Sequence, residues 1–200
     1  MNDSRPDQYP LHPAFDPDLA AWFKSLEDLP SAEFTIRRAT AGSSDARQLR
    51  YLQGVCEPIT IQTERYNETM IAEQLVLLAM VGQTHVGFSV SKTGANESDP
   101  LFIQLVGVAE AARGRGIGSA LLQAATAQAP ARTIAFATED KNLAARSMAA
   151  RFAAAIGAEL RPVKLGSYRD EDLGIRRGLG YRSWTIARTH PAVAGAVVEA

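Results

Sequence analysis

The chain has 200 residues, of which 46% are hydrophobic and 22% charged, enough to bury the core of one globular domain. Its formal net charge of −1 excludes a global basic field that would recruit nucleic acid or an anionic membrane, so any anion site must be local. The single cysteine, Cys56, excludes an internal disulfide framework and favours a reducing compartment. The sequence shows neither a signal peptide nor a run of about 18 apolar residues, and we expect a cytoplasmic protein without nucleic-acid or membrane partners.

The first part of the chain is rich in proline and aspartate, which predicts an arm outside the main sheet. Asp16 as N-cap and Pro17 at the first helical position, followed by apolar residues at helical spacing, predict a short amphipathic helix over 17–28. These patterns divide the chain into an arm, a domain and a C-terminal tail, over 1–32, 33–189 and 190–200.

Strands and helices alternate irregularly after the arm, as the apolar periodicity shows. The first part predicts, in chain order, a strand over 33–40, a serine-capped helix over 43–54, a helix around 65–74, a hairpin over 75–92 and a strand over 101–108. The second part predicts a helix over 115–129, a strand over 133–138, an alanine-rich helix over 142–156, and strands near 158–168 and 181–188. Mixed order of this kind indicates an α/β (α+β) fold.

The stretch "VGVAEAARGRGIGSALLQAA" joins the strand at 101–108 to the helix that follows. Its glycines at alternate positions lack a Cβ, so the backbone can take unusual φ values and its amides can converge on a ligand, while Ile117 faces the core. We expect the helix to begin at about Arg115, where its free N–H groups and dipole favour an anion. Arg113 and Arg115 add formal charge there. The junction therefore predicts a phosphate-bearing ligand.

Two common phosphate-binding motifs do not fit this junction. The dinucleotide fingerprint would need glycine at Ser119, and the Gly-Lys-Ser/Thr ending of a P-loop is absent. Glycines also serve close packing of a helix on a strand, but packing explains neither the two arginines nor three glycines together. An alternative is that Arg113 and Arg115 are ordinary surface charges exposed to solvent.

Arg113, Gly116 and Gly118 match Q/R-x-x-G-x-G/A, and the chain therefore resembles the GNAT superfamily of N-acetyltransferases. The resemblance runs from about Phe34 to Ile186, and it includes the hairpin and apolar strand before the motif and the strand, helix and glycine after it. It implies the GNAT fold, in which helices flank a central mixed, largely antiparallel sheet of six to seven strands.

The resemblance also implies a co-substrate, acetyl-CoA, and no metal. In this family the loop amides hold the pyrophosphate, and the backbone of the preceding strand pairs with the pantetheine arm as an added strand would. Asn142 matches the residue that holds the CoA arm. The implied cofactor-binding residues are Val106, Gly107, Val108, Arg113, Gly114, Arg115, Gly116, Ile117, Gly118, Ser119 and Asn142.

The helix over 142–156 departs from the family pattern. Asn142 and Gly157 lie further apart than the matching residues do in the family. If the family pattern is aligned on Gly157 instead, Arg146 or Ser147 takes the position of Asn142. The position of the family's tyrosine falls on an alanine. The proton donor to the CoA thiolate is then water or a tyrosine from the last strands. Of the two candidates, Tyr168 and Tyr181, we favour Tyr168 because it lies nearer the end of its predicted strand.

The implied reaction is direct attack of a primary amine on acetyl-CoA in a ternary complex. Glu139 and Asp140 lie at the carboxyl end of the strand 133–138, where ligands of open α/β sheets bind, and we take Glu139 as the candidate base. The segment 57–68 shapes the acceptor pocket in this family, and its residues Glu57, Glu64 and Glu68 hint at a cationic amine.

We expect a small molecule or a peptide as the acceptor, and the sequence leaves open whether the protein forms a homodimer. A second hypothesis is a GNAT-fold protein that binds acyl-CoA as a sensor or interaction module without turnover. Gln104 interrupts an apolar strand and either faces the cleft or occupies an ordinary edge position.

Overall fold

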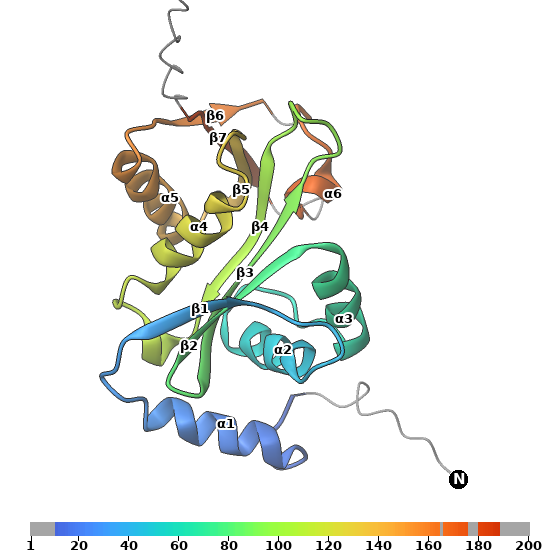
Figure 1. Ribbon diagram of the computed structural model, residues 1–200, viewed down its shortest axis with the longest axis vertical. Coiled ribbons are helices and arrows are strands. Elements are labelled where there is room, and N and C mark those ends of the chain that lie inside the picture. Colours follow the sequence, from blue (N-terminus) through green and yellow to red (C-terminus); the bar gives the residue numbers. More distant parts are fainter. Residues whose placement is uncertain (1–10, 165, 176–179, 189–200) are drawn as a thin grey trace, which may run out of the picture.

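The computed structural model describes residues 11–164, 166–175 and 180–188. Its centre is a seven-stranded sheet in the order β1-β2-β3-β4-β5-β7-β6 (Figure 1). Only the β4–β5 pair among the described strands is parallel, which confirms the expected mixed, largely antiparallel sheet. The strands are β1 (Phe34–Arg38), β2 (Leu75–Val81), β3 (Thr84–Thr93), β4 (Leu101–Val108), β5 (Ile134–Glu139), β6 (Leu160–Val163) and β7 (Tyr181–Ile186).

Helices cover both faces of the sheet, with α4 and α5 on one face and α2, α3 and α6 on the other (Figure 1). The helices are α1 (Pro17–Glu27), α2 (Asp45–Val55), α3 (Glu64–Glu73), the 3-10 turn η2 (Glu110–Ala112), α4 (Ile117–Ala127), α5 (Leu143–Ala155) and α6 (Asp170–Leu173). The short α6 and η2 were not expected, because elements of three or four residues leave no periodic pattern.

The predicted helix of the arm forms and docks on the sheet. The Asp16 carboxylate accepts a hydrogen bond from the Leu19 N–H (3.0 Å), which caps α1. The Trp22 indole N–H donates to the carbonyl of His85 on β3 (3.0 Å), and the Tyr51 hydroxyl donates to Asp16 (2.8 Å). The division into arm, domain and tail stays a prediction, and the tail lies outside the described residues.

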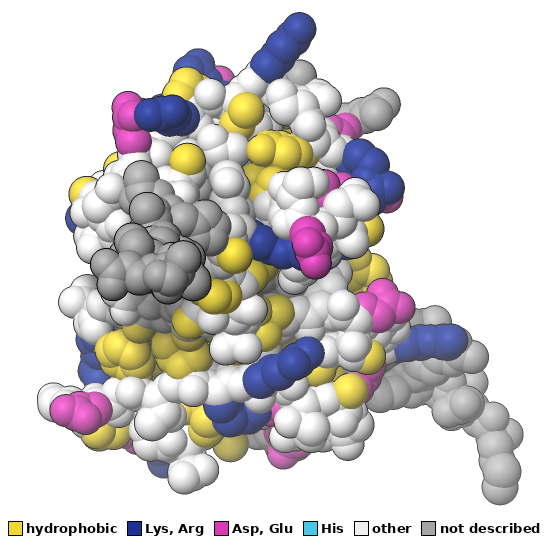
Figure 2. Space-filling view, turned by 45° about the horizontal axis from the view of Figure 1, so that its top comes forward, with side chains coloured by type: hydrophobic (Ala, Val, Ile, Leu, Met, Phe, Trp, Pro, Cys, Tyr) yellow, Lys and Arg dark blue, Asp and Glu magenta, His cyan; other side chains and the backbone are white. Residues whose placement is uncertain are grey.

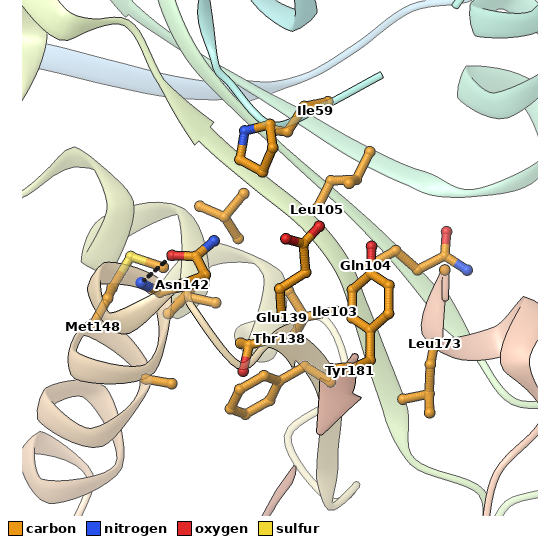
Figure 3. Close-up of a pocket in the computed structure, with 18 of the residues that line it drawn as sticks. Ile59, Ile103, Gln104, Leu105, Thr138, Glu139, Asn142, Met148, Leu173 and Tyr181 are labelled. Atoms are coloured by element: carbon orange, nitrogen blue, oxygen red, sulfur yellow. Dashed lines mark hydrogen bonds between the residues drawn. The ribbon is translucent and has the colours of Figure 1, made fainter. Parts of the chain in front are cut away.

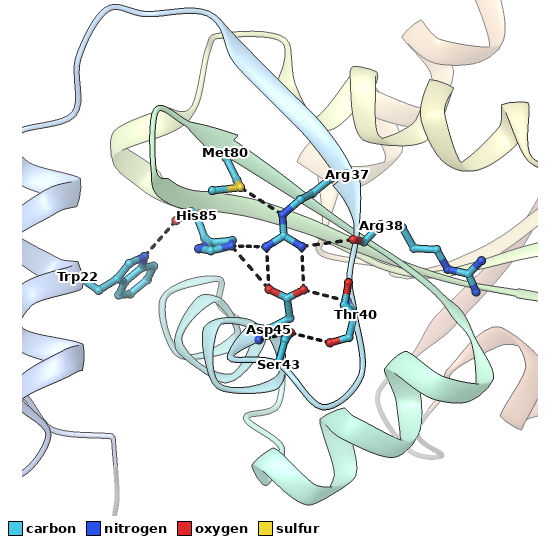
Figure 4. A network of polar contacts seen from close by, with 8 residues as sticks. All are labelled: Trp22, Arg37, Arg38, Thr40, Ser43, Asp45, Met80 and His85. Atoms are coloured by element: carbon cyan, nitrogen blue, oxygen red, sulfur yellow. Dashed lines mark hydrogen bonds and ion pairs between the residues drawn. The ribbon is translucent and has the colours of Figure 1, made fainter.

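A partly buried polar network joins β1, α2 and β3 (Figure 4). Arg37 donates two hydrogen bonds of 2.7 Å to the buried Asp45 carboxylate, which also accepts from the Thr40 N–H (2.8 Å). His85 Nε2 lies 3.0 Å from the same guanidinium. The N-cap of α2 is Ser44, but its side chain makes no capping hydrogen bond, and the preceding Ser43 hydroxyl accepts from the Asp45 N–H instead (3.2 Å).

Strand β4 changes its pairing along its length. It pairs with β3 up to Val108, with a bulge that leaves Gln104 between paired neighbours, but its parallel pairing with β5 covers only Leu101–Ile103. Beyond Ile103 the two strands therefore diverge. Over the described part of the chain, no strand pairs with the edge of β4 that faces β5 from there to Val108.

Candidate functional site

The divergence of β4 and β5 opens a cavity of about 340 Å³ in the sheet (Figure 3). Its walls come from β4, β5, α5, the segment 58–62 between α2 and α3, and the end of α6. Glu139 reaches into the cavity toward Leu105, with Tyr181 beside it and Asn142 on the α5 side. Glu139 and Tyr181 are neighbours because they are directly paired across β5 and β7.

The glycine loop at the end of β4 forms a cradle of backbone amides. Gly114 and Gly116 have φ of +81° and +80°, and a Cβ built on either would meet no atom within 4 Å. Helix α4 begins at Ile117 rather than at the predicted Arg115, because the left-handed backbone of Gly116 cannot belong to a helix. The first-turn N–H groups, including that of Ser119, have no intrahelical partner and suit a phosphate.

Gly118 differs from the other two glycines of the loop. It belongs to α4, so the expectation of an unusual φ does not hold for it. A Cβ at this position would lie 2.8 Å from Sδ of Met148 on α5. Gly118 therefore allows α4 and α5 to pack closely, and close packing accounts for this one glycine of the three. The buried Ile117 faces the core as expected.

Both arginine side chains of the loop contact main-chain oxygens. Arg113 Nε donates to the carbonyl of Val108 (3.3 Å), across the turn that follows β4. Arg115 donates to the carbonyl of Pro30 in the arm (2.7 Å). Arg113 is thus held at the end of β4, whereas the Arg115 side chain extends to the arm. On the face shown in Figure 2, side chains of Lys and Arg and of Asp and Glu are interspersed, without one large area of a single charge.

Several of the residues expected to bind the cofactor are brought together around the opening. Val106 and Asn142 line the cavity, and the others continue from the end of β4 into the glycine loop. Gly107 packs closely against Phe88 and the buried Cys56, since a Cβ on it would lie 2.7 Å from the Phe88 ring. Burial raises the pKa of the Cys56 thiol to about 11, so this cysteine is an inert core residue.

Asn142 is the N-cap of α5, and its side-chain oxygen accepts from the Ala145 N–H (3.0 Å). Its alternatives in the other register do not line the cavity. The Arg146 guanidinium lies over the Trp184 ring, 5.9 Å from its centre, and the Ser147 hydroxyl accepts from Arg151 (2.8 Å). The structure therefore favours Asn142, whose cap fixes it at the rim.

Of the acidic residues considered for the acceptor side, only Glu139 lines the cavity. Glu139 lines the cavity, whereas Asp140 is paired with Arg182. In the segment 57–68, Glu64 pairs with Arg47 (3.2 Å) and Glu68 accepts from the Gly42 N–H (2.9 Å). This segment instead lines the cavity with the uncharged residues Pro58, Ile59, Thr60, Gln62 and Tyr66. The acids of this segment therefore give no support to a cationic acceptor.

Tyr168, the tyrosine favoured from the sequence, lies behind one wall of the cavity rather than in its lining. Its ring packs edge-on against Phe102, with 5.4 Å between the ring centres, and burial raises the pKa of its hydroxyl. Tyr181 does line the cavity. Leu173 and Gly174 of the α6 region also line it, and no sequence signal indicated them because α6 itself was not expected.

Comparisons with known proteins agree with this geometry. The model of the acetyltransferase (GNAT) family matches residues 44–154, more than half of the chain, and the chain belongs to this family. No curated protein matches the sequence. Among the described residues, no helix is long and apolar enough to cross a membrane, and no three metal-binding side chains cluster.

Solved structures of GNAT enzymes share the fold at low sequence identity. Diaminobutyrate acetyltransferase EctA from Paenibacillus lautus is 17% identical with a TM-score of 0.62, and the match covers 78% of this chain and 95% of that one. The ribosomal-protein-S18-alanine N-acetyltransferase of Escherichia coli is 13% identical with a TM-score of 0.57, and the match covers 82% of this chain and 100% of that one. Arabidopsis thaliana Naa50 is 19% identical with a TM-score of 0.54, and the match covers 76% of this chain and 97% of that one.

Proposed function

We propose that this protein transfers the acetyl group of acetyl-CoA to a primary amine by direct attack in a ternary complex. The observation that carries the proposal is the unpaired edge of β4, which connects the glycine cradle at α4 to the cavity that contains Glu139. Acetyl-CoA is long, with its phosphates toward one end and its thioester at the other, and this arrangement offers a matching site to the pyrophosphate and to the thioester.

The residues present fit acetyl-CoA along this path. The amides of Gly114 to Ser119 suit the pyrophosphate, because the φ values of Gly114 and Gly116 leave the cradle open to an anion. No described strand pairs with the β5 side of β4 over Val106 to Val108, so this edge is the proposed partner of the pantetheine amides, and the Val108 carbonyl there already accepts from Arg113 Nε (3.3 Å). Asn142 stands at the α5 side of the cavity. Bound there, acetyl-CoA supplies the activated acyl group.

Glu139 is the proposed base. An ammonium of pKa ~10.4 is almost fully protonated at pH 7, and supplying the neutral amine costs about 4 to 5 kcal/mol. Holding amine and thioester in attack geometry contributes about 7 to 11 kcal/mol, and a positioned base about 10²–10⁴ in rate. Glu139 takes one proton from the ammonium, directly or through a water, and the neutral nitrogen then bonds to the carbonyl carbon. The C–S bond breaks, and the nitrogen loses its second proton to solvent, which balances the proton that the thiolate gains.

The thiolate that leaves takes a proton from a tyrosine hydroxyl or from water. Its pKa, close to the ~8.5 of a free thiol, makes it a tolerable leaving group, so an acid helps modestly. The sequence favours Tyr168 for this role, but the cavity lining favours Tyr181. A backbone N–H of β4 near Val106 or Val108 would stabilise the oxyanion of the attacked carbonyl.

The solved relatives support an amine acceptor. EctA was solved in complex with L-2,4-diaminobutyric acid and coenzyme A, and Naa50 with the bisubstrate analogue CoA-Ac-MVNAL. One is a small-molecule amine and the other contains a peptide, so both kinds of acceptor occur on this fold.

The test is release of free thiol from acetyl-CoA in the presence of a panel of amines. Steady release with any amine supports the transferase. Acetyl-CoA at 100 times its Kd should also stabilise the fold by about 2.7 kcal/mol, and ATP or NADH should do far less. Tight binding without turnover across the panel would instead favour the acyl-CoA-binding module, and equal stabilisation by ATP would contradict the cofactor assignment.

A further inference from the structure

The acceptor end of the cavity lies between the segment 58–62 with Tyr66 on one side and α6 with Tyr181 on the other (Figure 3). Its surface is made of apolar side chains such as Ile59 and Leu173 and of uncharged polar ones such as Gln62. Glu139 is the only charged residue among the described residues that line the cavity.

None of the three acids of α6 lines this space. The Asp172 carboxylate is buried, 7% exposed, and accepts from Lys92 Nζ (2.7 Å) and Arg169 Nε (2.9 Å). Glu171 pairs with Arg169 at 2.8 Å. The helix therefore contributes Leu173 to the cavity lining, while Glu171 and Asp172 are in ion pairs and do not line it.

Hydrogen bonds also connect α6 to β4, the strand proposed to pair with the pantetheine arm. The side-chain amide of Gln104, at the bulge of β4, donates to the carbonyls of Glu171 (3.0 Å) and Asp172 (2.9 Å). The lining that α6 contributes is thus held by two sets of contacts, one from β4 and one from Lys92 on β3. A wall held in this way cannot easily turn an acid toward the ligand.

Resting on the proposed function, we propose that the acceptor is a primary amine with a single positive charge and an uncharged, largely apolar body. Its ammonium faces Glu139, and its body lies against Ile59, Tyr66 and Leu173. Against the buried Leu173, a second ammonium or a carboxylate would lose its water without gaining a partner, because the described lining offers neither a second acid nor a cationic side chain. Unpaired charge is costly to bury, so polyamines and amino acids should be poor acceptors.

The experiment compares kcat/KM for three amines in the thiol-release assay. Phenethylamine has one charge and an apolar body, phenylalanine adds a carboxylate to the same body, and spermidine is an aliphatic chain with two further positive charges. We expect phenethylamine to exceed the other two by at least about tenfold, because a buried group without its partner is strongly rejected. Faster release with phenylalanine or spermidine would overturn the proposed class and leave acetyl transfer standing. No release with any amine, with acetyl-CoA still bound, would refute the proposed function itself.

A charge variant of the lining tests the cause of the selectivity. Gln62→Glu adds a second carboxylate at nearly constant size, and Gln123→Glu is the matched control, since it makes the same change at an exposed position of α4 that does not line the cavity. Relative to phenethylamine, kcat/KM for spermidine should rise at least about tenfold in Gln62→Glu only. A rise in both variants, or in neither, would show that the lining charge does not select the acceptor. Thermal unfolding of both variants is the control that shows whether they are folded.

Discussion

Gly118 on α4 and Met148 on α5 are so close that a Cβ on the glycine would lie 2.8 Å from the methionine Sδ. This contact sets the distance between the two helices on one face of the sheet. Gly116, two residues earlier, has the opposite surroundings, because its φ is +80° and nothing lies within 4 Å of its Cβ position. The two glycines of one motif therefore have different physical roles, one in packing and one in backbone conformation.

The first prediction separates these roles. Gly118→Val should lower the free energy of unfolding by about 1–3 kcal/mol through overpacking. Gly116→Ala should cost about 1–2 kcal/mol through its left-handed backbone and should also weaken acetyl-CoA binding. Gly42→Ala is the matched control, because Gly42 has a φ of +74° with open space but lies outside the loop. Calorimetry giving unchanged acetyl-CoA affinity for Gly116→Ala would count against the cradle.

The second prediction concerns the base. Glu139→Gln keeps the size of the side chain and removes its proton affinity, so kcat should fall about 10²–10⁴-fold while the Kd of acetyl-CoA stays the same. Asp140→Asn is the control, since Asp140 is the next residue but pairs with Arg182 outside the cavity lining. Steady-state kinetics on both variants decide the matter. Equal losses in the two would exclude Glu139 as a specific base.

The third prediction compares the two tyrosines. Tyr181→Phe and Tyr168→Phe each remove one hydroxyl and keep the ring. Because Tyr181 lines the cavity and Tyr168 packs on Phe102, we expect kcat to fall at least about tenfold in Tyr181→Phe only, equivalent to about 1.4 kcal/mol of transition-state stabilisation. A loss confined to Tyr168→Phe would instead identify Tyr168 as the donor. Unchanged kcat from pH 6 to 9 in both variants would leave water as the donor.

The fourth prediction is a pH dependence of stability. Burial, and then the Arg37 charge, lower the pKa of His85, so the folded protein favours the neutral imidazole. The unfolded chain takes up this proton near pH ~6.5, so the free energy of unfolding should fall below that pH, by at most about 1.4 kcal/mol per pH unit. His85→Gln keeps an acceptor for Arg37 and should flatten the curve between pH 5 and 7 in urea unfolding. A curve that keeps its slope in this variant would assign the effect to other groups.

Asp45 acts in a lower pH range. The hydrogen bonds from Arg37 lower the pKa of its carboxyl, so its contribution is complete above the unfolded value of ~3.9 and is lost as pH falls from there through the folded value. Asp45 therefore cannot account for a loss of stability between pH 5 and 7, and the two groups are separable by pH.

The sequence alone determined the features that depend on residues close together in the chain. Caps and apolar periodicity located most helices and strands, as with Asp16 and Pro17 at α1, because these signals act within one or two turns. The spacing of Arg113, Gly116 and Gly118 indicated the phosphate loop and the family for the same reason. The φ values of Gly114 and Gly116 are properties of local backbone that glycine alone tolerates easily.

Only the tertiary structure decided which side chains share the cavity. Gln104 reaches the carbonyl of Asp172, 68 residues later, and Arg115 reaches Pro30, 85 residues earlier, and no local pattern encodes such contacts. The choice among the acids likewise depends on partners from other elements, since Glu64 is drawn to Arg47 while Glu139 stays at the cavity. Chain order gives the residues of a site, but packing between distant elements sets which of them face one another.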